Sequence, residues 1–347
     1  MICLDFEHIN ALNYKDYINA SSLNGYEGLN SFIDTCDAWY KGDSSFEFQT
    51  SGSTSRPKII TFHRSQVEAS CKQTIDYFGL NKGDKLLLCL PLSYVAGKMM
   101  LLRAIVGGFK LFLSEDNKFP WSGLNETIDF GAMVPMQLDR LENREQSLKI
   151  RHLLLGGAPL QSRHISQIKD LGLKAYQSFG MTETLSHFAM KRLFLNEEAY
   201  TLLPNVKIKY GNDNVLSVIV PWIKNDWLQT DDVVEIQGVN KFIWKGRQSN
   251  VINSGGVKLH PESIESKLQS FFSSRAYFIY SLPSSKYGEK IGLFIEGAPI
   301  NNIENQLSSC LSSKERPKAV YYIPQFKYST AGKLLKRESA QSVISDL

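Results

Sequence analysis

The chain carries the polar stretch Thr50-Ser51-Gly52-Ser53-Thr54-Ser55-Arg56-Pro57-Lys58 directly after the strand-like run Phe46-Glu47-Phe48-Gln49. Its hydroxyl groups and bare backbone N–H groups are donors for phosphate oxygens, and its two cations supply countercharge. It is not a Walker A loop, because Pro57 replaces the second glycine and neither Ser nor Thr follows Lys58. By itself the stretch fits a grip on a polyphosphate and a polar surface loop equally well.

Composition narrows the class of protein. A chain of 347 residues predicts about two domains, and 43% hydrophobic with 21% charged residues is typical of a soluble globular protein. The formal net charge of +4 is small and dispersed, which argues against a nucleic-acid partner. The five cysteines are far apart and lack a C-x-x-C pair, which favours free cytosolic thiols over disulfides or zinc. We expect a cytoplasmic protein with no signal peptide and no membrane insertion.

A helix is predicted directly after the opening stretch. Ser65-Gln66-Val67-Glu68 has the form of a capping box, in which the first and fourth residues satisfy backbone N–H groups reciprocally. Apolar residues then recur at helical spacing, namely Val67, Cys71, Ile75 and Phe78. Gly79 stands where such a helix would stop.

Strands and helices alternate as far as residue 179. The predicted strands are 85–90, 109–113, 131–134, 152–155 and 174–177. The predicted helices between them are 97–106, 135–142 and 161–171. Alternation of this kind predicts a largely parallel sheet covered by helices, with ligands beyond the carboxyl ends of the strands.

The pattern changes after about residue 200. Short runs at 206–210, 215–220, 233–237 and 241–245 are joined by Gly, Asn and Asp turns and predict antiparallel hairpins. A polar turn at 246–250 is the candidate linker. It is followed by a helix from Pro261, strands at 276–281, 291–296 and 319–323, and a helix at 303–311. We therefore predict an α/β fold: a large domain at 1–246 with parallel sheets and a β-rich subdomain, a hinge at 247–250 and a small α+β domain at 251–347.

Further polar segments fall at predicted strand ends. Gly156-Gly157-Ala158-Pro159 follows one strand, where small residues allow a flat ligand to lie against the backbone or simply form a tight turn. In Gln177-Ser178-Phe179-Gly180-Met181-Thr182-Glu183-Thr184, Phe179 can stack on a base, Thr182 can bind phosphate and Glu183 can hold Mg²⁺. A carboxylate of Thr230-Asp231-Asp232 can accept ribose hydroxyls, and Lys327-Tyr328-Ser329-Thr330-Ala331-Gly332-Lys333 has the composition of a flexible loop with a cation.

These segments, in this order, resemble the adenylate-forming superfamily of acyl-CoA synthetases, nonribosomal adenylation domains and luciferases. The resemblance runs from Phe46 to Arg337 and includes the series Gly246-Arg247 … Ser254-Gly255-Gly256 … Pro261-Glu262-x-Ile264-Glu265. It implies a two-step reaction in which a carboxylate attacks the α-phosphorus of ATP and a thiol then displaces AMP. It also implies a mobile small domain, with Ser249 at the hinge.

The resemblance implies roles for individual residues. The β- and γ-phosphates would be held by Thr50, Ser51, Gly52, Ser53, Thr54 and Lys58, and adenine would be bracketed by Gly156, Gly157, Ala158 and Phe179. Thr182 would touch the α-phosphate and Glu183 would coordinate Mg²⁺. The ribose would be held by Asp232 and Arg247. Lys333 would bridge the carboxylate and the α-phosphate as negative charge develops. Gly255, Gly256 and Lys258 would face the thiol substrate, CoA.

Three features depart from the superfamily pattern. Thr230-Asp231-Asp232 replaces Thr-Gly-Asp, so Asp231 competes with Asp232 for the ribose role. Ser249-Asn250 replaces a frequent acidic pair at the hinge. Only about 45 residues precede the opening stretch, so we expect the large domain to have a shortened N-terminus.

Two more segments, residues 90–100 and 133–138, resemble o-succinylbenzoate–CoA ligases of menaquinone biosynthesis. The acid would be an aromatic keto-diacid, whose second carboxylate needs donors or a cation. Ser93, Tyr94, Lys98 and Gln137 are the candidate acid-binding residues. Arg103 lies on the same segment, where we expect it to be a surface cation of an amphipathic helix, and Lys98 is open to the same interpretation.

Other functions remain open at this point. One is a different aryl- or acyl-CoA ligase, and another is an adenylation enzyme that loads a carrier protein. A non-catalytic nucleotide-binding protein is the alternative from a different class. The joint presence of Glu183 and Lys333 argues against it, because binding alone would not need a lysine on a mobile loop.

Overall fold

The computed structural model describes residues 1–20, 23, 26, 28–50, 58–114, 119–138, 149–272, 275–328 and 334–344. Contacts within the chain divide it into two compact units. Unit 1 consists of Met1–Pro159, Ser166–Lys207 and Ile219–Trp227, and unit 2 of Leu160–Ile165, Ile208–Val218 and Leu228–Leu347. The domain bounds predicted from the sequence, with a hinge at 247–250, stay a prediction.

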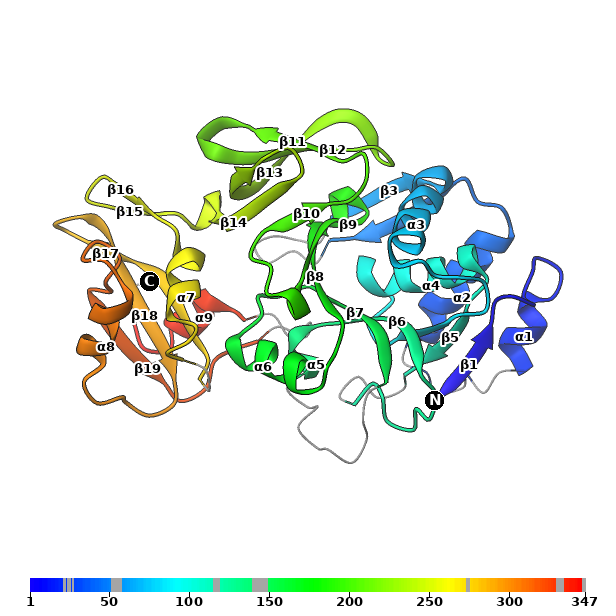
Figure 1. The fold of residues 1–347 in the computed structure, drawn as a ribbon, viewed down its shortest axis with the longest axis horizontal. Helices are drawn as coiled ribbons and strands as arrows, with labels where there is room; N and C mark the ends of the chain where they lie inside the picture. The colour runs from blue at the N-terminus through cyan, green and yellow to red at the C-terminus, as the bar shows by residue number, and fades with distance from the viewer. Residues whose placement is uncertain are drawn as a thin grey trace. The chain divides into compact units, whose positions relative to one another are not determined.

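Unit 1 contains a sheet with strands in the order β1-β5-β4-β6-β7-β8-β9-β10 (Figure 1). Their bounds are β1 Ile2–Asp5, β4 Lys85–Leu88, β5 Lys110–Leu113, β6 Ile128–Met133, β7 Ile150–Leu155, β8 Ala175–Met181, β9 Ser186–Arg192 and β10 Tyr200–Leu202. The five strands from β5 to β8 pair in parallel, whereas β1, β9 and β10 pair antiparallel. The predicted α/β fold class with a mainly parallel sheet is therefore confirmed.

Helices alternate with the parallel strands. Their bounds are α1 Tyr14–Ala20, α2 Leu29–Tyr40, α3 Arg64–Phe78, α4 Val95–Gly107, α5 Pro135–Leu138 and α6 Ser162–Asp170. Gly79 ends α3 with φ +61°, as predicted, because glycine adopts the left-handed conformation without a Cβ penalty. The rest of the helix predicted beyond Leu138, at 139–142, lies outside the described residues. None of the helices in the described part of the chain has the length and apolar composition needed to cross a membrane.

The predicted capping box at the start of α3 is wrong. The helix begins at Arg64, and the backbone N–H of His63 donates to Gln66 Oε1 at 2.8 Å. Glu68 instead accepts from Arg64 Nε at 3.0 Å. The helix starts earlier than expected because β3 leads into it without a turn.

A short hairpin packs on α3 and α4. It consists of β2 Ser45–Gln49 and β3 Ile59–His63, paired antiparallel. The shared core contains Phe46, Phe48, Phe62, Val67, Cys71, Met99, Leu102 and Leu185. The opening stretch of the sequence therefore connects the two strands of a hairpin, and the second strand was not predicted.

Unit 2 contains two groups of strands. The first has the order β14-β13-β12-β11, most of whose residues belong to this unit, and the second is a smaller sheet. The bounds are β11 Lys207–Tyr210, β12 Val215–Val220, β13 Lys224–Gln237 and β14 Lys241–Arg247. The smaller sheet has the order β16-β15-β18-β17, with β19 parallel to β18. Its elements are β15 Ile252–Ser254, β16 Val257–Leu259, α7 Pro261–Leu268, β17 Tyr277–Ser284, β18 Gly288–Glu296, α8 Ile303–Cys310, β19 Ala319–Ile323 and α9 Lys336–Ala340. The predicted helices and strands of the small α+β part are confirmed.

The close approach of α4 to the chain before it generates a prediction. A Cβ at Gly97 would lie 2.3 Å from Pro91 O and 2.6 Å from Leu90 O, both backbone atoms. Helix propensity alone would favour Gly97→Ala by about 1 kcal/mol. We expect the clash to dominate and to destabilise the protein by about 1–3 kcal/mol, seen as a lower thermal unfolding midpoint. Ala96→Gly, on the exposed side of the same turn, is the control and should cost only about 1 kcal/mol. A higher midpoint for Gly97→Ala would contradict this packing.

Candidate active site

The carboxyl ends of the parallel strands are tied together by three polar groups. Gln137 Nε2 donates to Cys89 O at 3.1 Å after β4, and its Oε1 accepts from Val134 N at 3.0 Å after β6. Gly156 N after β7 donates to Met133 O at 3.2 Å. Ser178 Oγ on β8 donates to Leu155 O at 3.0 Å. These hydrogen bonds fix one edge of the sheet. Gln137, which was predicted to bind the acid, uses both its amide nitrogen and its amide oxygen in them.

The glycine pair lies at this edge as predicted. A Cβ at Gly156 would meet Ser178 Oγ at 2.5 Å, and Gly157 has φ +82°. Both positions therefore require glycine for reasons of packing and backbone conformation. Ala158 follows them and is half-buried. The turn presents backbone without side chains, which is the surface that a flat base needs.

Phe179 is half-buried on β8, where rings surround it. Its centroid lies 5.6 Å from that of Phe188 in an edge-on arrangement and 5.0 Å from that of Tyr200. These neighbours hold the ring in one orientation. Its predicted contact with adenine stays a prediction.

Thr182, Glu183 and Thr184 form a 3₁₀ turn between β8 and β9. The turn ends in two residues with positive φ, Leu185 at 51° and Ser186 at 96°, a conformation that costs free energy in residues other than glycine. Thr184 Oγ1 accepts from Met181 N at 3.0 Å. The surrounding structure must hold this turn, because its own backbone conformation is unfavourable.

Buried donors from other elements supply that support. Ser70 Oγ on α3 donates to Leu185 O at 2.7 Å, and Trp222 Nε1 donates to Thr184 O at 3.2 Å. Among the described residues the Glu183 carboxylate has no hydrogen-bond or ion-pair partner, and the residue is half-buried. An unpaired carboxylate on a fixed turn suits Mg²⁺, which prefers oxygen ligands. The residues present therefore fit the predicted magnesium role of Glu183.

Arg103 is the largest fully buried side chain in the described structure, at 1% exposure. Its Nη2 donates to Ser186 Oγ at 3.0 Å, while its Nε is buried and lacks a hydrogen-bond partner. The prediction that Arg103 is a surface cation is wrong. Its neighbours Leu101, Leu102 and Ala104 in α4 are apolar and buried, so Arg103 is enclosed with them, and this uninterrupted apolar run was visible in the sequence.

No carboxylate pairs with Arg103 among the residues that the structure describes. Buried His187 contacts the same serine as Arg103: its Nδ1 lies 3.2 Å from Ser186 Oγ. Burial and the neighbouring Arg103 lower the pKa of His187 to about 3, so the imidazole is neutral. Burial also lowers the pKa of Arg103. The guanidinium is thus a buried cation whose countercharge does not come from these residues.

The base of the opening stretch is closed by two hydrogen bonds. Thr50 N donates to Lys58 O at 2.8 Å, and Lys58 N donates to Thr50 Oγ1 at 3.0 Å. Ser51, Gly52, Ser53 and Thr54 lie outside the described residues, so their phosphate role stays a prediction. Gln49 forms a parallel bridge with Tyr94, which places the candidate acid segment beside this base.

Lys98 lies against the same hairpin. Its Nζ donates to Glu47 O at 2.9 Å and lies 5.4 Å from the centroid of the Phe48 ring. Burial lowers the pKa of Lys98. Ser93 is exposed and Tyr94 is half-buried before α4. The acid-binding role of these residues stays a prediction.

Asp232 and Arg247 face each other across β13 and β14 in unit 2. They are partners in the strand register, with Asp232 Oδ1 at 3.8 Å from Arg247 Nε and 2.8 Å from Trp244 Nε1. Burial raises the pKa of Asp232, and Trp244 and Arg247 oppose that rise. Asp231 instead accepts from Ser249, both from its N–H at 3.2 Å and from its hydroxyl. Of the two competing carboxylates, Asp232 is the one beside Arg247.

Of the predicted CoA residues, Gly255 and Gly256 form the hairpin turn between β15 and β16, and Lys258 lies on β16. Gly255 and Gly256 have φ +58° and +82°, and Gly255 N donates to Tyr287 O at 3.0 Å. Lys258 Nζ lies 3.1 Å from Asp213 Oδ1 in an exposed ion pair. Lys333 lies outside the described residues. The roles of all four residues stay predictions.

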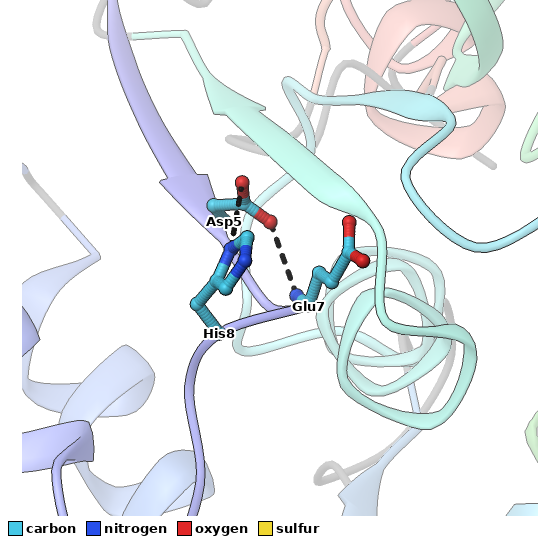
Figure 2. Close-up of side chains that lie close together, drawn as sticks. All are labelled: Asp5, Glu7 and His8. Atoms are coloured by element: carbon cyan, nitrogen blue, oxygen red, sulfur yellow. Dashed lines mark hydrogen bonds and ion pairs between the residues drawn. The ribbon is translucent and has the colours of Figure 1, made fainter.

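Asp5, Glu7 and His8 form the one cluster in the described residues whose ligand atoms lie close enough to hold a metal (Figure 2). The Asp5 carboxylate accepts from Glu7 N at 3.1 Å and lies 3.3 Å from His8 Nδ1. Lys82 lies 3.4 Å from Glu7, and Lys110 lies 3.8 Å from Asp5. These partners already satisfy the charges of an exposed turn, so the cluster needs no metal.

A sequence profile described as AMP-binding enzyme matches residues 39–215, about half of the chain. The chain belongs to the AMP-binding enzyme family. The predicted membership of the adenylate-forming superfamily is therefore confirmed. The match covers the hairpin, the glycine pair and the Glu183 turn, so the geometry described above for unit 1 is that of a family member.

The chain is similar in sequence or in structure to several known proteins. A 2-succinylbenzoate–CoA ligase from Lactococcus lactis is 24% identical over 83% of this chain and 69% of its own length. One from Staphylococcus epidermidis is 26% identical over 83% and 68%. An acyl-CoA synthetase (AMP-forming)/AMP-acid ligase II-like protein from Dyadobacter fermentans is 35% identical over 94% of this chain and 98% of its own, with a TM-score of 0.63. An o-succinylbenzoate coenzyme A synthetase from Bacillus subtilis, in complex with ATP and magnesium, shares the fold with a TM-score of 0.74 at 20% identity, over 85% and 69% of the two chains.

The neutral state of His187 generates a prediction about pH. Because its folded pKa of about 3 lies below the ordinary 6.5, its contribution to stability is complete above pH 6.5 and is lost as the pH falls towards 3. The stability difference between the wild type and His187→Gln should therefore shrink by up to about 1.4 kcal/mol per pH unit in that window. Denaturant unfolding of both proteins between pH 7 and 4 measures it. A difference independent of pH would show that His187 is not held neutral.

Proposed function

We propose that this protein is an ATP-dependent, AMP-forming acid–CoA ligase that converts o-succinylbenzoate to o-succinylbenzoyl-CoA. Membership of the AMP-binding enzyme family supports the reaction type, and the names of several relatives support the acid and the place in menaquinone biosynthesis. The single observation that carries the choice of a diacid is the buried, uncompensated guanidinium of Arg103.

Charge balance at Arg103 favours an acid with two carboxylates. A buried ion without a partner carries a desolvation penalty of several kcal/mol. The only carboxylate of a monocarboxylic acid reacts at the α-phosphorus, so none is left to neutralise Arg103. A keto-diacid has a second carboxylate, and Arg103 can receive it beside the turn that carries Glu183. Lys98, also desolvated, is the other cation on this segment.

The nucleotide is assigned to the edge of the sheet. Gly156 and Gly157 present bare backbone to adenine, Phe179 is the ring beside it, and Thr182 faces the α-phosphate. Glu183 would hold Mg²⁺, which neutralises phosphate charge when bound. Asp232 and Arg247 hold the ribose hydroxyls, and the closed base at Thr50 and Lys58 carries the phosphate loop.

The reaction has two steps. A carboxylate oxygen of the acid attacks the α-phosphorus, and the bond to pyrophosphate breaks. The CoA thiol then attacks the acyl carbon, the bond to AMP breaks and the thiol proton is released. Lys333 stabilises the charge that develops in the first step, and CoA approaches past Gly255, Gly256 and Lys258 in the second. We place the enzyme in the cytoplasm, because all five cysteines are free thiols, which a reducing compartment maintains.

Pyrophosphate release from ATP and Mg²⁺ tests the proposal. It should be fastest with o-succinylbenzoate, should increase with CoA, and should be slow but measurable with benzoate or a medium-chain fatty acid. Faster turnover with another acid would replace the substrate but keep the mechanism. No turnover with any acid, together with measurable ATP binding, would favour a nucleotide-binding protein without catalysis.

Arg103→Met tests the assignment of the second carboxylate. Losing one partner of a desolvated, charge-assisted pair costs about 2–5 kcal/mol, so we expect kcat/KM for o-succinylbenzoate to fall about 100-fold. Residual turnover of monocarboxylic acids should stay within about twofold, because they do not use this cation. Arg192→Met is the matched control, since Arg192 pairs with Glu197 at the surface of the same unit. An equal loss with every acid would mean that Arg103 only supports the turn through Ser186.

Lys333→Ala separates the two steps. We expect acid-dependent pyrophosphate release to fall by about 100-fold or more, because a positioned cation is lost from the transition state. Conversion of synthetic o-succinylbenzoyl-adenylate and CoA to thioester should persist. If both half-reactions survived unchanged, the role assigned to Lys333 would be wrong.

A further inference from the structure

A segment between β12 and β13 contacts the turn that carries Glu183. The segment reads Pro221-Trp222-Ile223, and residues 219–227 belong to unit 1, as does the turn. Trp222 is buried, at 6% exposure, and its Nε1 donates to Thr184 O at 3.2 Å. The indole therefore holds the residue directly after Glu183.

Helix α3 fixes this segment and the turn together. Gln66 Nε2 on α3 donates to Ile223 O at 2.6 Å, and Ile223 packs against the core cluster that contains Leu185. Ser70 lies four residues later, on the same face of the helix, and its Oγ donates to Leu185 O at 2.7 Å. The helix thus holds the turn directly through Ser70 and indirectly through the segment that carries Trp222.

The two donors act where the backbone of the turn is least favourable. Thr184 O belongs to the peptide group before Leu185, and Leu185 O belongs to the peptide group before Ser186. Leu185 and Ser186 are the two residues with positive φ, at 51° and 96°. Such conformations persist in residues other than glycine only where the surroundings impose them. The indole N–H and the Ser70 hydroxyl therefore determine the path of the chain just after Glu183.

We propose that Trp222 is a positioning residue for Glu183: by holding Thr184 O, it fixes the turn from which the Glu183 carboxylate binds Mg²⁺. The inference rests on the proposed function, since it assumes that Glu183 holds the metal that accompanies ATP. Its physical basis is that a group which orients a metal ligand, without touching the metal, contributes about 10- to 100-fold to metal affinity. In this scheme Trp222 contacts neither the nucleotide nor the acid.

Trp222→Phe tests the role of the indole N–H, because it keeps an aromatic ring and removes the donor. The Kd of ATP is measured by calorimetry with excess Mg²⁺ and again with EDTA, and the ratio of the two values is the gain in affinity that Mg²⁺ provides. We expect Trp222→Phe to reduce this gain about tenfold and to leave the Kd with EDTA within about twofold of wild type. Ser70→Ala removes the second donor and should act in the same direction.

A double-mutant cycle with Glu183 separates positioning from other effects of the indole. Glu183→Gln removes the charge of the metal ligand and should abolish most of the gain from Mg²⁺. In that background Trp222→Phe should cause no further loss, because the two residues act through the same contact with the metal. A further loss as large as the one in wild type would mean that the indole acts elsewhere, and it would overturn the proposal.

Trp121→Phe is the matched control. Trp121 is 5% exposed, so the same substitution is made at equal burial, and it lies in unit 1 between β5 and β6. Both Kd values should stay within about twofold of wild type. The positioning role would be overturned if Trp121→Phe reduced the gain as much as Trp222→Phe does. It would also be overturned if Trp222→Phe weakened ATP binding equally with Mg²⁺ and with EDTA, or left the gain unchanged.

Hydrogen exchange of the indole N–H groups tests the contact itself. The chain has five tryptophans, and the NMR signal of Trp222 is the one that Trp222→Phe lacks. We expect this proton to exchange slowly with solvent, because the donor is buried and bonded to Thr184 O. Rapid exchange would show that the indole does not hold the turn, and it would overturn the proposal.

None of these measurements needs turnover, so the two proposals can fail separately. If the wild type gained ATP affinity from Mg²⁺ but released no pyrophosphate with any acid, the proposed ligase function would be wrong, and the cycle would still decide the role of Trp222. If Mg²⁺ gave the wild type no gain in ATP affinity, the metal role of Glu183 would be wrong, and the inference about Trp222 would be overturned with it.

Discussion

Parallel pairing of β4, β6, β7 and β8 is the constraint on which the candidate site in unit 1 depends. Parallel strands bring their carboxyl ends to one edge, and each end here is tied to the next by a polar group: Gln137, Gly156 N and Ser178 Oγ. The turn at Gly156 and Gly157 and the turn at Glu183 both follow strands of this edge, so the edge sets their positions. Residues that look like ligand contacts in the sequence, such as Gln137, are therefore also the scaffold of the site.

The reversal of chain direction after β8 is costly and is stabilised from outside. Two consecutive residues with positive φ end the turn, and groups from α3, α4 and Trp222 hold it. Arg103 contributes to this support while keeping a buried, unpaired Nε. If the same guanidinium also binds a substrate carboxylate, as proposed, the choice of acid is linked to the geometry of the Glu183 turn.

In unit 2, carboxylates connect neighbouring elements. Asp232 pairs with Arg247 across two strands, Asp231 binds the Ser249 turn, and Glu265 on α7 pairs with Lys336 at the start of α9. The departures from the superfamily pattern at Asp231 and Ser249 are thus in contact with each other. Two changes that look independent along the sequence form one hydrogen-bonded unit.

The sequence was enough to predict the family, the alternation of strands and helices between residues 85 and 177, and the segments that carry the chemistry, because periodicity, glycine positions and motif spacing are local properties of a chain. It did not determine that β9 reverses direction after the Glu183 turn, that β3 completes a hairpin and leads directly into α3, or that Arg103 is buried. These features emerge on folding, because burial and strand pairing depend on contacts between residues far apart in the chain. Charge is where the difference matters most: a lysine or arginine is only a cation in the sequence, and its surroundings decide whether it is solvated, paired or left for a ligand.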